Sequence, residues 1–193
     1  MAGVLGSSIR RREDPALITG KGKYSDDLKR PNMAFAAIVR SPYAHAKISS
    51  IDTSAAAEAD GVLAVFTHQE VTDSGTVGSI PVGWLLPEIK TPEHPMLARD
   101  TVRYVGDAVA VVVAENRYAA RDAVDLVYVD YDALPASVNP KTTVEEGAVQ
   151  IHKEAPGNIA FDWELGDREA TESAFAHAAN VVEFSSRNNR LIP

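Results

Sequence analysis

Short apolar runs of strand length recur along the chain, separated by stretches rich in glycine, proline and charged residues. These runs are expected to be β-strands: residues 33–39, 46–51, 62–66, 102–104 and 108–114. Residues 33–39 and 108–114 are apolar throughout, which is typical of strands buried on both faces, whereas residues 46–51 alternate as a half-buried strand does. The pattern predicts a sheet with residues 108–114 at its centre.

The clearest helical pattern begins after Asn116, a residue type that caps helix N-termini well. Its apolar residues form one stripe at helical spacing: Ala119, Ala120, Ala123, Val124 and Val127. With the strand before it and a strand expected at residues 126–131, this helix predicts a strand–helix–strand unit.

The remaining segments have weaker secondary-structure patterns. Short helices are expected at residues 55–59, 67–72 and 143–146, and an edge strand at residues 158–165. A further helix follows Gly166-Asp167 and carries an apolar set: Ala170, Ala174, Phe175 and Ala178. Residues 73–99 contain many glycines and prolines and predict a long functional or interaction loop, in which Trp84-Leu85-Leu86 fills the core or anchors an interface.

The amino-acid composition disfavours or excludes several classes of function. The formal net charge of -8 disfavours nucleic-acid binding, which requires a basic surface. The absence of cysteine excludes disulfides, thiolate metal sites, iron–sulfur ligation and cysteine nucleophiles. No apolar run has membrane-spanning length, and residues 1–28 lack the apolar region of a secretory signal. A cytoplasmic location is expected.

Three positions have both a chemical and a structural interpretation. His45 follows a Ser-Pro-Tyr turn and is either a general base or substrate-funnel residue, or a histidine hydrogen-bonded to backbone. Asp26-Asp27 either holds a cation or shapes a turn. Gly106-Asp107 either binds an anion through backbone amides or forms a turn between two strands. We favour the structural interpretation for each.

Other candidate sites have less support. His68, His94, His152 and His177 are scattered without metal-ligand spacing. Gly20-Lys21-Gly22 fits neither the P-loop nor the dinucleotide fingerprint, and Ser41 lies outside a nucleophile elbow. Arg187 and Arg190 either face cofactor phosphates in an assembled enzyme or are solvated charges on an edge strand, which we favour.

Several ordered segments resemble the N-terminal part of the molybdopterin-binding large subunit of molybdenum hydroxylases, the family of xanthine dehydrogenases, aldehyde oxidases and aerobic carbon monoxide dehydrogenases. The segments are Ser8-Ile-Arg-Arg-Arg-Glu-Asp-Pro15, Leu17-Ile-Thr-Gly-Lys-Gly-Lys-Tyr-Ser-Asp-Asp27, Arg40-Ser-Pro-Tyr-Ala-His-Ala46, Val102-Arg-Tyr-Val-Gly-Asp-Ala-Val-Ala110, Asp130-Tyr-Asp-Ala-Leu-Pro135 and Gly166-Asp167. The resemblance covers nearly the whole chain.

The resemblance implies an α/β (α+β) fold, an α/β-hammerhead domain with a mixed sheet and packed helices. The implied division is an N-terminal arm (residues 1–31), the hammerhead domain (32–138), a linker with short helices (139–178) and the first strand of a truncated molybdopterin-binding domain (179–193). That last strand would need a partner for its backbone groups.

In such enzymes a molybdenum ion on a pterin hydroxylates aldehydes or heterocycles, or oxidises carbon monoxide. The family's glycine-rich cofactor segments, active-site glutamine and catalytic glutamate have no counterpart here, so no catalytic, cofactor-binding or metal-binding residue is carried over.

The main hypothesis is therefore the scaffold and interface portion of a molybdenum-cofactor oxidoreductase, inactive by itself. Its expected partners are a molybdopterin-domain polypeptide and iron–sulfur and flavin subunits or domains, assembled as an oligomer. One alternative is a stand-alone binding or assembly module that kept the fold without catalysis. A small independent enzyme using residues 73–99 and His94 ranks last, because no paired acid and base is recognisable.

Overall fold

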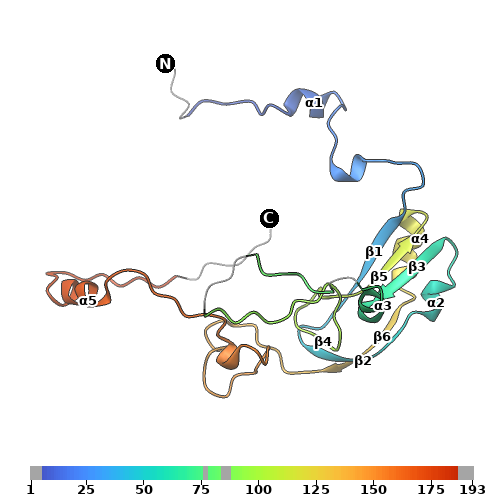
Figure 1. The fold of residues 1–193 in the computed structure, drawn as a ribbon. Helices are drawn as coiled ribbons and strands as arrows, with labels where there is room; N and C mark the ends of the chain where they lie inside the picture. The colour runs from blue at the N-terminus through green and yellow to red at the C-terminus, as the bar shows by residue number, and fades with distance from the viewer. Residues whose placement is uncertain (1–5, 76–77, 84–87, 187–193) are drawn as a thin grey trace.

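Two small antiparallel sheets form the folded centre of the computed structural model, which describes residues 6–75, 78–83 and 88–186 (Figure 1). In the first sheet β5 lies between β1 and β3; in the second, β2 lies between β4 and β6. The strands are β1 (Phe35–Arg40), β2 (Ala46–Asp52), β3 (Val62–Thr67), β4 (Thr101–Val102), β5 (Ala108–Ala114) and β6 (Tyr128–Ala133). The helices are α1 (Asp14–Ile18), η1 (Ser25–Asp27), α2 (Ser54–Ala57), α3 (His68–Asp73), α4 (Arg117–Val124), η2 (Pro156–Asn158) and α5 (Arg168–Ala176).

The apolar run of β5 serves two cores. Val112 and Ala110 belong to a cluster with Val39 and with Ala123 of α4. Val109, which points to the opposite face because strand side chains alternate, belongs to a second cluster that contains residues of β2 and β4. A strand buried on both faces has no polar side, which explains the uninterrupted apolar sequence.

Helix α4 covers the first sheet and begins where the sequence predicts. The Asn116 side chain accepts hydrogen bonds from the backbone amides of Tyr118 and Ala119, at 3.0 and 2.9 Å. Ala120 and Ala123 are buried against the sheet because their small side chains allow a close approach. Gly61 adopts a φ of +78°, and a Cβ there would lie 3.3 Å from the Ala119 Cβ, so glycine suits this position on two counts.

The expected α/β (α+β) class, strands with packed helices, is confirmed, but the sheet arrangement differs from the expected mixed sheet: every strand pair in the described residues is antiparallel. The predicted strand–helix–strand unit exists as β5–α4–β6. Its last strand pairs with β2, in the other sheet. Strand β1 is an edge strand with alternating burial, so the prediction that residues 33–39 are buried on both faces was wrong.

Outside the sheets several local predictions fail. Residues 158–165 form no strand within the part of the chain described, and residues 143–146 form turns instead of a helix. Helix α5 is capped by Asp167, whose carboxylate accepts from the Ala170 amide at 2.9 Å, but none of its residues is buried. Residues 179–186 form no strand, and the rest of the predicted last strand lies outside the described residues.

The N-terminal arm, residues 1–31, precedes β1 in the chain. It contains the short elements α1 and η1, and Figure 1 shows it extending away from the sheets. Its attachment includes an ion pair between Asp26 of η1 and Arg117 of α4, at 3.4 Å. Within the described ranges, no helix combines the length and the apolar character that crossing a bilayer demands.

Candidate functional site

A pocket of about 210 Å³, with both apolar and polar side chains in its lining, lies where the long loop, the β4–β5 connection and the linker meet. Its lining includes His94 of the loop, Arg103, Tyr104 and Asp107 of the connection, and His152 of the linker. These residues span nearly 60 positions of sequence, and nothing in their spacing indicates that they converge. Sequence reasoning therefore missed the pocket.

Arg103 connects two of the segments that form this pocket, the β4–β5 connection and the linker. Its backbone amide donates to a carboxylate oxygen of Asp107 at 3.0 Å, which closes the turn before β5. Its guanidinium donates to the backbone carbonyl oxygens of Ile151 and Thr101, each at 3.3 Å. The arginine side chain thus fastens the linker to the sheet region by hydrogen bonds to backbone.

The electrostatic surroundings favour neutral forms of two groups in this pocket. Burial lowers the pKa of His152, and the nearby positive charge of Arg103 lowers it further. Burial raises the pKa of Tyr104, and the negative charge of Asp107 adds to that effect. A neutral imidazole and a protonated phenol can exchange hydrogen bonds with a small polar ligand.

His45 is buried where β2 begins, and its Nδ1 atom lies 2.7 Å from the carbonyl oxygen of Pro135. The hydrogen bond to backbone that we favoured for this residue is confirmed. The bond joins the start of β2 to the segment after β6, so the side chain holds two ends of the second sheet together.

The two aspartate positions are also structural. A carboxylate oxygen of Asp27 accepts from the Tyr24 amide at 2.9 Å and closes η1, while Asp26 pairs with Arg117. Gly106 has a φ of +92° in the turn before β5, and its amide donates to the Ser41 carbonyl at 2.8 Å. The turn interpretations of Asp26-Asp27 and Gly106-Asp107 are confirmed.

His68 and His177 do not line the pocket of His94 and His152. His68 Nδ1 lies 3.1 Å from the Leu97 carbonyl oxygen, and His177 Nδ1 lies 2.7 Å from that of Ser173 in its own helix. Among the residues described, no group of three or more histidine, cysteine, aspartate and glutamate side chains is placed to hold a metal ion. Arg187, Arg190 and Trp84-Leu85-Leu86 lie outside the described residues.

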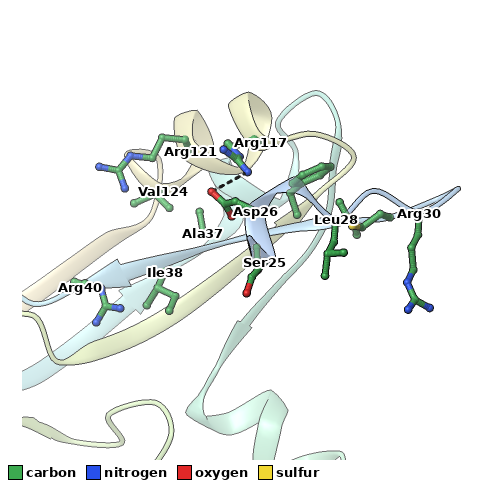
Figure 2. Close-up of a pocket in the computed structure, with 14 residues that line it drawn as sticks. Ser25, Asp26, Leu28, Arg30, Ala37, Ile38, Arg40, Arg117, Arg121 and Val124 are labelled. Carbon is green, nitrogen blue, oxygen red and sulfur yellow. Dashed lines mark ion pairs between the residues drawn. The ribbon is translucent and has the colours of Figure 1, made fainter. Parts of the chain in front are cut away.

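A second concave surface, the arginine groove, lies between the N-terminal arm and helix α4 and has a volume of about 1090 Å³ (Figure 2). Strand β1 and the residues just before it form its floor, and Ser25 and Leu28 belong to the arm. Its charged lining residues are Asp26, Arg30, Arg40, Arg117 and Arg121.

Comparison with known proteins places this geometry in context. Residues 19–135 match the family described as "Aldehyde oxidase and xanthine dehydrogenase, a/b hammerhead domain". The chain is 38% identical to the nicotine 6-hydroxylase large subunit of Paenarthrobacter nicotinovorans, over 93% of the chain and 21% of that protein. It is 36% identical to the carbon monoxide dehydrogenase large chain of Afipia carboxidovorans, over 98% of the chain and 24% of that protein.

Solved structures agree with the sequence matches. A Cu,Mo-CO dehydrogenase structure superposes with a TM-score of 0.74 and 37% identity, covering 91% of this chain and 23% of that one. An aldehyde oxidoreductase from Desulfovibrio gigas superposes with a TM-score of 0.70 and 33% identity, covering 78% of this chain and 17% of that one. The chain therefore spans less than a quarter of the length of these relatives.

Proposed function

Because the chain belongs to the aldehyde oxidase and xanthine dehydrogenase family through its a/b hammerhead domain, we propose that it is the scaffold and interface portion of a molybdenum-cofactor oxidoreductase. The supporting observation is the superposition on a Cu,Mo-CO dehydrogenase across 91% of this chain but only 23% of that protein. In the relatives a much longer polypeptide carries the named activity.

The complete enzyme, in this proposal, hydroxylates aldehydes or nitrogen heterocycles or oxidises carbon monoxide. The relatives' names point to these substrate classes: nicotine 6-hydroxylase, carbon monoxide dehydrogenase and aldehyde oxidoreductase. The molybdenum cofactor would supply the redox chemistry when bound.

Two groups of this chain that could face a cofactor phosphate are already bonded within the chain. A pterin phosphate needs backbone amides or cations directed at it, but the amide of Gly106 is already donated to Ser41. Arg103 directs its guanidinium to backbone carbonyl groups of this chain. We therefore assign the cofactor to other parts of the complete enzyme.

The chain's own residues suit a rigid support. The linker after β6 is ordered by Asn158, whose side-chain amide donates to the carbonyl oxygens of Thr143 and Val149 at 2.9 and 2.8 Å. The linker is also tied to the sheet region through Arg103 and Ile151. A segment fixed in this way would deliver the following polypeptide to its neighbour at a defined position.

The proposed neighbours are a molybdopterin-domain polypeptide and the iron–sulfur and flavin subunits or domains of the same enzyme, in a cytoplasmic oligomer. Subunit names among the relatives, such as "large subunit" and "large chain", support assembly in general terms. Large exposed apolar side chains near the end of the described region are consistent with contacts of this kind: Phe175, Val182 and Phe184.

An association measurement tests this proposal. The purified chain is titrated, by calorimetry, into a carbon monoxide dehydrogenase large chain from which the region matching this chain has been removed. We expect a one-to-one complex that the relative's own matching region displaces competitively. Absence of association, or association that the matching region cannot displace, would contradict the proposed scaffold role and favour a stand-alone module.

A further inference from the structure

The arginine groove runs along the flank of an edge strand. Its floor is lined by consecutive residues 33–38 and by Arg40, so side chains from both faces of β1 border it (Figure 2). A cavity over one face of a sheet would be lined by alternate residues. Consecutive lining residues place the groove at the strand's outer edge, opposite the side on which β1 pairs with β5.

An edge of this kind offers the hydrogen-bonding groups of its backbone to another strand. Extended peptides bind such edges by adding a strand, with affinity from backbone hydrogen bonds and selectivity from side chains. Many proteins protect their edges with a covering loop or a proline. In the described structure, residues of the arm and of α4 line the groove beside β1, and the Asp26–Arg117 ion pair joins the two elements.

The charged residues that line the groove favour an acidic partner. Four arginines line the groove against one carboxylate, Asp26, which pairs with Arg117. Arg40 donates to the Gly106 carbonyl at 2.8 Å. Arg121 on α4 and Arg30 on the arm are both exposed and both line the groove. In a chain of net charge -8, this is a local concentration of positive charge.

The floor of the groove is largely apolar. Phe35 and Ala37 are half-buried, while Ile38 remains 37% exposed. A strand that added here would cover Ile38 with one set of alternating side chains and direct charged side chains toward the arginines that line the groove. We propose that the outer edge of β1 binds an extended acidic polypeptide segment of a partner protein as an added strand.

The experiment uses the full chain and defined peptides. The probe is a fluorescein-labelled octapeptide of alternating threonine and glutamate, and its binding is followed by anisotropy at low ionic strength. Three comparison ligands are the threonine–lysine octapeptide, the acidic peptide N-methylated at alternate residues, and a single-stranded oligonucleotide of similar charge. Arg121→Glu and Arg30→Glu alter the groove, and Arg168→Glu on the exposed helix α5 is the charge-matched control.

We expect the acidic peptide to bind saturably. Each groove substitution should weaken it about tenfold or more, because a like charge faces the ligand, while Arg168→Glu changes the affinity less than twofold. N-methylation should cause a comparable loss, since it blocks strand pairing without changing charge. Circular dichroism verifies that the variants are folded.

Several results would overturn the inference. These are no binding of the acidic peptide, equal loss in the Arg168→Glu control, full binding of the N-methylated peptide, or equally tight binding of the lysine peptide or the oligonucleotide. The edge and the arginines do not depend on the family membership of the chain. The peptide experiment can therefore fail while the titration against the truncated large chain succeeds, and the reverse.

Discussion

The imidazole of His45 and the carbonyl oxygen of Pro135 lie 2.7 Å apart, although 90 residues separate them in the sequence. This bond closes the second sheet, because β2 begins just after His45 and β6 ends just before Pro135. A hydrogen bond between buried groups stabilises the fold modestly. Removing one partner destabilises the fold further, because the other buried group is left without a hydrogen bond.

Replacing His45 with alanine should lower the free energy of unfolding by about 1–3 kcal/mol, since the Pro135 carbonyl would lose its partner and a small cavity would form. The measurement is urea unfolding at pH 7 followed by circular dichroism. His177→Ala is the control, because that histidine is exposed and bonds within its own helix. Equal stability of the two variants would show that the hydrogen bond between His45 and Pro135 does not stabilise the fold.

Val112 occupies the centre of the first sheet with no exposed surface. Val112→Ala removes two methylene equivalents from a packed core and should destabilise the chain by roughly 2 kcal/mol. Leu63→Ala is the matched control on β3, where the side chain is 57% exposed, and it should change stability little. Thermal melts of both variants check the ranking, and a larger loss for Leu63→Ala would contradict the assignment of the core.

The lowered pKa of His152 predicts that the stability of the chain depends on pH. The pKa of His152 is lowered by burial first and by Arg103 next, with His94 and His45 adding to the effect and Glu154 opposing it. The unfolded chain therefore binds the proton more readily than the folded chain does. As pH falls below the unfolded pKa of 6.5 toward the lower folded pKa, protonation of the unfolded state reduces stability.

As pH falls from 6.5 toward the lower folded pKa of His152, the free energy of unfolding of the wild-type chain should decrease. The decrease should be smaller for His152→Gln. The measurement is a series of urea titrations between about pH 5 and pH 8, on either side of the ordinary histidine pKa. His177→Gln, which replaces an exposed histidine outside the pocket, serves as the control variant. Superimposable profiles for wild type and His152→Gln would rule out this contribution.

The N-terminus of α3 is closed by a reciprocal cap. Glu70 accepts from the Thr67 amide at 2.7 Å and from the Thr67 hydroxyl, while that hydroxyl accepts from the Gln69 amide at 3.3 Å. The Thr67 hydroxyl lowers the pKa of Glu70, although burial acts in the opposite direction. The cap is therefore fully effective above the ordinary glutamate pKa of 4.5 and is lost as pH falls through the lower folded value.

Thr67→Ala should cost about 1 kcal/mol of stability at neutral pH. Thr72→Ala, in the same helix, should cost less, because its hydroxyl bonds the His68 carbonyl without capping the helix start. Urea unfolding at pH 7 and at pH 3 separates the two effects. The difference between wild type and Thr67→Ala should shrink at the lower pH, and a constant difference would argue against the carboxylate's part in the cap.

Local features were predictable from the sequence where short-range chemistry decides them. Helix α4 begins directly after Asn116, because the capping side chain bonds to backbone amides of the next few residues. The continuous apolar run of β5 indicated burial on both faces, and β5 lies at the centre of its sheet. Strand β1 was misjudged for a physical reason: exposed alanine costs little, so an alanine-rich run does not prove burial on both faces.

Long-range relationships were not predictable from one sequence. The pairing of β6 with β2 depends on which sheet offers a free edge, and the spacing of residues does not encode that. The meeting of His94, Arg103 and His152 depends on how the long loop and the linker fold back. The arginine groove likewise combines residues of the arm, β1 and α4.

Substrate-dependent dye reduction tests the central claim most directly. The chain and the truncated carbon monoxide dehydrogenase large chain are combined with the molybdenum cofactor and the electron-accepting subunits, and assayed with carbon monoxide, an aldehyde and a nitrogen heterocycle. The proposed scaffold role predicts turnover of at least one substrate in the combined sample and none with either polypeptide omitted. Turnover by this chain alone without molybdenum, or no turnover in the complete mixture, would contradict it.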